Sequence, residues 1–141
     1  MSETPSMLDL NMNDVYETEM LPDGEEQELR IAKAEMKEKK KAPGEFQLVV
    51  ILEDPSNDKI DDIWLYMGVP TVDERQNSPK TANRKMQRIQ QFYDAFDIDY
   101  SQPVMMADLQ GQTGWAVVGI QAAQDSFPEK NYVKSFTVKA A

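Results

Sequence analysis

The sequence predicts a mainly β protein, a five-stranded Greek-key barrel of the OB-fold type with one α-helix between its third and fourth strands. Three observations predict it. Alternating apolar residues indicate three strands in a row between residues 29 and 69 and two more after residue 114. Apolar residues at helical spacing occupy residues 78–97, between the two groups of strands. The resulting order, β-β-β-α-β-β, is the order expected of an OB-fold.

The distribution of charge divides the chain into an arm and a domain. The net charge is −10, but residues 1–28 hold nine acidic residues and no basic one, whereas residues 29–141 hold sixteen acidic and fifteen basic residues. The segment Leu21-Pro-Asp-Gly24 has Pro and Gly where a β-turn favours them. We therefore expect a flexible acidic arm at residues 1–20 and an OB-fold, nucleic-acid-binding domain at residues 21–141.

The first strand, around residues 29–36, is predicted to contain a bulge. Apolar residues alternate up to Ile31, and the pattern then shifts by one residue before Ala34 and Met36 continue it. Such a shift in a period-2 pattern is what a β-bulge near Ala32-Lys33 produces, and bulged strands bend a small sheet toward closure.

Residues 45–53 and 60–69 form the next two predicted strands, joined by a turn at residues 54–58. Alternation places one set of apolar side chains on the core face of these strands: Phe46, Leu48, Val50, Leu52, Ile63, Leu65, Met67 and Val69. Trp64 and Tyr66 then point to the opposite face. Apolar groups on both faces of so small a sheet imply that the outer face is covered or used.

Ser78-Pro79 is typical of a helix start, with an N-cap followed by Pro at the first helical position. Apolar residues follow at spacings of three and four, which predicts a helix ending near Asp97. The predicted apolar stripe consists of Ala82, Met86, Ile89, Phe92, Tyr93 and Phe96. After an acidic linker, the last two strands are predicted at residues 115–121 and 132–138, joined by a loop at residues 125–131.

Composition excludes several classes of function. The chain has no Cys and no His, which excludes disulfides, thiol nucleophiles, Ser-His triads and imidazole acid–base catalysis. The acid pairs Asp61/Asp62 and Asp97/Asp99 have no basic catalyst or Gly-rich phosphate loop beside them. We expect no catalytic residue, no metal and no cofactor. The longest apolar run, 48–52, is far shorter than the roughly 20 residues of a membrane span, and the N-terminus lacks a signal pattern, so we expect a cytoplasmic protein without a membrane partner.

The predicted topology gathers aromatic and basic residues on the surface that OB-folds use for binding. That surface is the face of the second and third strands, flanked by the loop between the first two strands and the loop between the last two. Candidates for stacking on bases are Trp64 and Tyr66, about 7 Å apart on one strand, and Phe127 in the last loop. Candidates for phosphate contacts are Arg30, Lys33, Lys37, Lys39, Lys40, Lys41, Lys130 and Lys134.

Several of these residues also have a structural explanation that involves no nucleic acid. The run Lys39–Lys41 can be a solvated loop, and Trp64 and Tyr66 can pack under the arm or in a subunit interface. Trp115, at the head of a strand, is expected in the core. The acidic arm can be a solubility tail, but its apolar residues favour a segment that competes with nucleic acid or recruits basic partners.

Several segments match one known family over roughly residues 21–137. They are Leu21-Pro-Asp-Gly24, Glu28-Leu-Arg-Ile-Ala-Lys-Ala-Glu35, Asp61-Asp-Ile-Trp-Leu-Tyr66, Val69-Pro-Thr71, Asn83-Arg-Lys-Met-Gln-Arg-Ile-Gln-Gln-Phe92, Gly111-Gln-Thr-Gly114 and Asn131-Tyr-Val-Lys134. In these segments the chain resembles a family of phage-encoded single-stranded DNA-binding proteins. The resemblance implies an OB-type fold and a role in phage DNA replication or recombination, in the cytoplasm of the bacterial host.

The function expected from the sequence is sequence-tolerant coating of single-stranded DNA, which needs a positive groove and aromatic faces. Replication or recombination proteins are further expected partners, through the arm, and a homo-oligomer is compatible with the sequence. The alternative is a protein-interaction module or dimeric structural protein that uses the same exposed aromatic face. Salt dependence of DNA binding distinguishes the two, because phosphate contacts release counterions.

Overall fold

Five antiparallel strands form one sheet in the order β3-β2-β1-β4-β5 in the computed structural model, which describes residues 7–139. The strands are β1 (Glu25–Glu38), β2 (Phe46–Glu53), β3 (Ile63–Gly68), β4 (Thr113–Gln121) and β5 (Lys130–Thr137). Two α-helices, α1 (Val72–Asn77) and α2 (Pro79–Ala95), separate β3 from β4, and two 3-10 turns lie at Met12–Asp14 and Met106–Leu109. The predicted mainly β class and the order of the five strands are confirmed.

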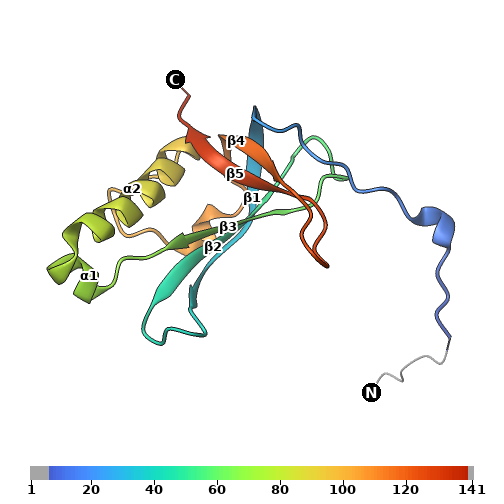
Figure 1. The fold of residues 1–141 in the computed structure, drawn as a ribbon. Coiled ribbons are helices and arrows are strands. Elements are labelled where there is room, and N and C mark those ends of the chain that lie inside the picture. Colours follow the sequence, from blue (N-terminus) through green and yellow to red (C-terminus); the bar gives the residue numbers. More distant parts are fainter. Residues whose placement is uncertain (1–6, 140–141) are drawn as a thin grey trace, which may run out of the picture.

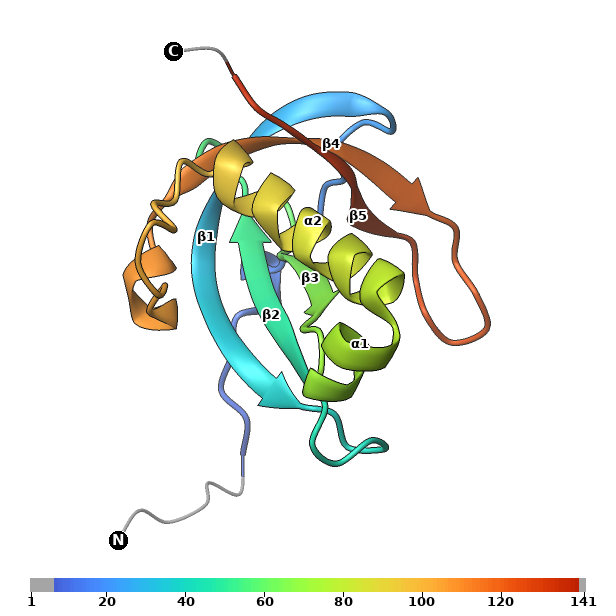
Figure 2. The same ribbon diagram turned by 90° about the vertical axis from the view of Figure 1, so that its left-hand side faces the viewer.

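The long strand β1 belongs to both halves of the sheet. Its first part, from Glu25 to Arg30, pairs with β4, and its later part pairs with β2. The register with β2 shifts between Ile31 and Lys33, which is the bulge predicted from the sequence. Figure 2 shows β1 bending around the sheet, as a bulged strand does.

The sheet curls without closing. Its edge strands β3 and β5 come into contact with each other, but within residues 7–139 no hydrogen-bonded ladder joins them. A closed barrel is therefore not what the sheet forms. The outer surfaces of β3 and β5 nevertheless become neighbours, although the two strands stand at opposite ends of the strand order.

Helix α2 lies across the sheet (Figure 2) and supplies the centre of the core. Phe92 and Phe96 are completely buried, and their ring centroids are 5.0 Å apart. They belong to one buried cluster with inward-facing residues of all five strands, among them Leu29, Ile31, Leu48, Val50, Leu65, Ala116, Val118 and Val133. Burial of this stripe holds α2 in place, since each large side chain contributes about 1.5–3 kcal/mol.

Three predictions about apolar positions were wrong. Phe46 is exposed because it is the first residue of β2, opposite Glu38, where both strands pass into the loop. Met86 is 55% exposed and faces a groove instead of the core. Trp115 is only half-buried, with the ammonium of Lys139 4.5 Å from its ring centroid.

The helical region also differs from its prediction. The long helix begins at Pro79 and ends at Ala95, close to Asp97 as expected, but the side chain of Ser78 makes no capping hydrogen bond. Helix α1 was not predicted. It begins with a capping box, in which Thr71 accepts from the backbone N–H of Glu74 (3.0 Å) and Glu74 accepts from that of Thr71 (3.1 Å).

The arm leaves the sheet on the side away from α1 and α2 (Figure 1). Its last residues are held to the domain: the backbone N–H of Glu19 donates to Lys59, and Leu21 exchanges two hydrogen bonds with the side chain of Asn131. Residues 7–19 before this point are exposed. Among the described residues, neither helix nor turn has the length and apolar character that a membrane span requires.

Candidate nucleic-acid interface

Trp64 and Tyr66 form a side-by-side aromatic pair on the outer face of β3. The strand buries Ile63, Leu65 and Met67 on its inner face, and the alternation leaves Trp64 and Tyr66 50% and 55% exposed. Their ring centroids are 6.3 Å apart and their planes differ by 19°. The pair offers two nearly parallel apolar faces to solvent.

The register of the sheet connects this pair to the basic residues of β1. Lys33 pairs with Ile51, which pairs with Trp64, and two positions along the ladder Glu35, Val49 and Tyr66 are aligned in the same manner. Partners in one row share a face, so both rows lie on the outer surface, with β1 and β3 about 10 Å apart. Val49 is buried and Ile51 half-buried, which makes the middle of this surface apolar.

Strand β5 completes the surface on the other side of the pair. A hollow of about 430 Å³ is lined by Trp64, Tyr66, Gln121, Lys130, Asn131 and Tyr132. The structure thus brings Lys130 together with the two predicted stacking residues. Tyr132, which is 38% exposed, adds a third aromatic ring that the sequence analysis missed. Its alternation with the buried Val133 was the available signal.

Gly119 makes room for two side chains of this surface. A Cβ at Gly119 would lie 2.6 Å from Cε of Lys134 and 2.8 Å from the ring of Tyr132. Both side chains therefore lie directly over the backbone of β4 at the position opposite Tyr132 in the ladder. Because Gly119 has no side chain, Tyr132 and Lys134 can lie this close to β4.

Lys134 has an acidic partner of its own. Its ammonium lies 3.5 Å from the carboxylate of Asp23, which also accepts a hydrogen bond of 2.9 Å from the backbone N–H of Ile120. The hydrogen bond from Ile120 and the charge of Lys134 hold the pKa of Asp23 below its ordinary value. Asp23 therefore stays ionised and competes with a phosphate for Lys134.

Four of the predicted phosphate contacts also have carboxylates nearby. Arg30 pairs with Glu53 at 2.8 Å, Lys33 and Lys37 lie 3.9 and 3.2 Å from Glu35, and Lys39 lies 4.0 Å from Glu45. Exposed pairs of this kind contribute about 0–1 kcal/mol, so a phosphate can replace the carboxylate. Among the described residues, Lys40, Lys41 and Lys130 have no carboxylate within 4.0 Å.

Phe127 lies apart from the hollow. It is 72% exposed near the end of the β4–β5 loop, where the backbones of Gln124 and Phe127 exchange two hydrogen bonds of 3.0 and 2.7 Å. This loop extends beyond the sheet (Figure 1). The two hydrogen bonds order the backbone around Phe127 while its ring remains in solvent.

A comparison with models of known protein families finds no match to this sequence, and a comparison with curated proteins finds none either. Within residues 7–139, no three acidic side chains gather closely enough to hold a metal ion. The candidate interface is therefore identified from the structure alone. It is the aromatic and basic outer surface of β1, β2, β3 and β5.

Proposed function

We propose that the protein binds single-stranded DNA without strong sequence preference and coats it during DNA replication or recombination, in a phage context. The observation that carries the proposal is the exposed pair of Trp64 and Tyr66. Ring stacking contributes about 1–3 kcal/mol per base and accepts every base, because each base has a π-face.

The spacing of the pair favours single strands over duplex. The two ring centroids are 6.3 Å apart, whereas successive nucleotides of one strand in a duplex rise about 3.4 Å. Two neighbouring bases can each face one ring only if they separate from each other. A single strand separates its bases freely, but a duplex must first be melted.

The fold proposed for this function is a partly open OB-type barrel. The curled sheet, the approach of β3 to β5 and the Greek-key strand order support it. OB-folds bind oligonucleotides on strands 2 and 3 and on the loops beside them. In this protein those places hold the aromatic pair, the run Lys39–Lys41 and Phe127.

The positive charge of the surface supports contacts with the phosphates of DNA that depend on salt concentration. Lys40, Lys41 and Lys130 are exposed. Lys130 lines the hollow beside the aromatic pair, and Lys40 and Lys41 lie on the β1–β2 loop. Each phosphate neutralised on a single strand lowers the slope of log K against log salt by about 0.7. Three such contacts predict a slope of about −2.

The test is fluorescence anisotropy with a labelled oligothymidine strand of about thirty bases and its duplex counterpart, over a series of salt concentrations. Trp64→Ala/Tyr66→Ala is expected to weaken single-strand binding by about 2–6 kcal/mol. Tyr100→Ala, another exposed tyrosine but on the α2 side, is the matched control and should bind normally. Equal affinity of the folded double variant and the wild type would refute the role of the pair. Absence of salt-dependent binding would favour a protein-interaction module instead.

A further inference from the structure

The arm carries apolar side chains that the domain of the same chain does not cover. Leu8 and Leu10 are 77% and 62% exposed, and Val15 and Tyr16 are 71% and 58% exposed. Burying one such side chain is worth about 1.5–3 kcal/mol. A tail that served only solubility would gain nothing from them, so the arm has the composition of a docking segment.

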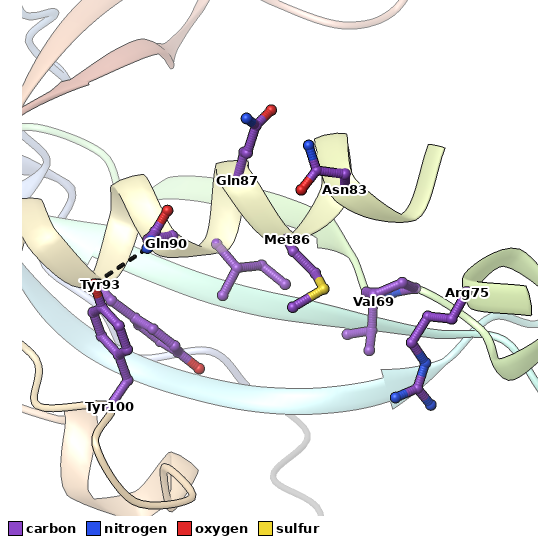
Figure 3. Close-up of a pocket in the computed structure, with 10 residues that line it drawn as sticks. Val69, Arg75, Asn83, Met86, Gln87, Gln90, Tyr93 and Tyr100 are labelled. Carbon is purple, nitrogen blue, oxygen red and sulfur yellow. Dashed lines mark hydrogen bonds between the residues drawn. The ribbon is translucent and has the colours of Figure 1, made fainter. Parts of the chain in front are cut away.

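A groove beside α2 has the complementary chemistry. Its volume is about 580 Å³, within the range of ligand-binding pockets. Figure 3 shows Met86 and Tyr93 of α2 along the groove, with Tyr100 beside Tyr93 at one end and with Val69 and Arg75 at the other. The rings of Tyr93 and Tyr100 stack with centroids 5.6 Å apart, and Met86 is 55% exposed. The groove presents apolar surface that the sheet and helices do not fill.

The charges of the arm and the groove are opposite. Arg75 is the one charged residue that lines the groove, and among the described residues it has no carboxylate within 4.0 Å. Its neighbour Glu74 is already engaged by Lys85 at 2.8 Å. The arm between residues 7 and 20 holds four acidic residues and no basic one. An acidic and apolar peptide therefore suits this groove better than a basic or neutral one.

We infer that the arm of one copy of this protein docks into the groove beside α2 of a second copy. The arm leaves the domain on the side away from α1 and α2 (Figure 1), so arm and groove point toward different neighbours. A contact of this kind is heterologous, because different surfaces of the two copies meet, and it joins copies into an open row. The copy at one end of the row keeps a free arm, and the copy at the other end keeps a free groove. The inference goes beyond DNA binding, and its test contains no DNA.

The test compares full-length variants by sedimentation velocity over a range of protein concentrations. The wild type is expected to associate as its concentration rises. Leu8→Ser/Leu10→Ser disables the arm, and Arg75→Glu/Met86→Glu disables the groove; each should weaken association by about tenfold or more. Arg84→Glu makes the same charge reversal as Arg75→Glu, at an exposed position of α2 that does not line the groove. It should associate like the wild type.

Mixing the two defective variants tests whether the docking is between copies. One contributes an intact groove and the other an intact arm, so an equimolar mixture should form dimers and nothing larger. Failure of the mixture to form dimers would overturn the inference, since it would mean that the arm folds back on its own chain or binds elsewhere. A wild type that stays monomeric, or an Arg84→Glu variant as defective as the groove variant, would overturn it equally.

Discussion

Gly119 links the backbone of β4 to the proposed DNA surface, and a single methyl group there should weaken binding without unfolding the protein. In Gly119→Ala the new Cβ would lie 2.8 Å from the ring of Tyr132 and 2.6 Å from Cε of Lys134. Ordinary contact begins near 3.4 Å, so the ring must retreat by about 0.6 Å and the lysine by about 0.8 Å. Both side chains reach solvent and can move.

The displaced ring of Tyr132 should lose much of its proposed stacking on a DNA base. Stacking on one aromatic side chain is worth about 1–3 kcal/mol, and a partial loss at the low end corresponds to about fivefold weaker binding. The free energy of unfolding should change by less than about 1 kcal/mol, because the strand gains Ala for Gly and nothing buried is compressed.

Gly114→Ala is the matched control, since it adds the same methyl group to the same strand. There the Cβ would meet Cγ of Phe96 at 2.5 Å and the carbonyl oxygen of Ala95 at 2.6 Å, and Phe96 is completely buried. Overpacking of this kind lowers the free energy of unfolding by about 1–3 kcal/mol.

The assay pairs urea denaturation with anisotropy on the oligothymidine strand. Gly119→Ala should lose affinity and keep stability, whereas folded Gly114→Ala should lose stability and keep affinity. Wild-type affinity in Gly119→Ala would refute a contact between Tyr132 and DNA.

Four further variants test the helices. Thr71→Ala removes the cap of α1 and should lower the free energy of unfolding by about 1 kcal/mol in urea; an unchanged midpoint would contradict the capping box. Hydrogen bonds from Lys85 and Thr71 hold the pKa of Glu74 below its ordinary value of 4.5. The extra stability of the wild type over Glu74→Gln should therefore be full above pH 4.5 and disappear as pH falls through the lowered pKa. Melting temperatures at several pH values check this, and a constant difference would count against it. Phe92→Ala should cost about 3–5 kcal/mol, whereas the exposed Met86→Ala should cost under about 1.

The sequence predicted features that depend on neighbouring residues along the chain. Alternation in residues 63–67 located the exposed aromatic pair, and one shift of that pattern located the bulge in β1. Helix α1 was missed because residues 72–77 carry no apolar periodicity, although Thr71 and Glu74 have the spacing of a capping box. In each case the signal lies within a few residues.

Features that depend on strand register were beyond the sequence. The carboxylates beside Arg30 and Lys33 come from Glu53 across the ladder and from Glu35 of the same strand, and only the paired structure shows which lysines have partners. Tyr132 joins Trp64 because β3 and β5 meet at the two edges of a curled sheet. No local pattern encodes that meeting.

Strand β1 pairs with both β2 and β4, and this has a consequence for the order in which the chain folds. The β1–β2 pair closes a short loop, residues 39–45, whereas β1 and β4 are separated by both helices and two strands. Because loop-closure entropy opposes the distant pairing, we expect the β1–β2 hairpin to form early and β4 to dock late. Valine-to-alanine changes in β2 should then slow refolding, while Val118→Ala in β4 should mainly speed unfolding, which stopped-flow kinetics can distinguish. Equal effects on refolding would show that the two halves of the sheet assemble together.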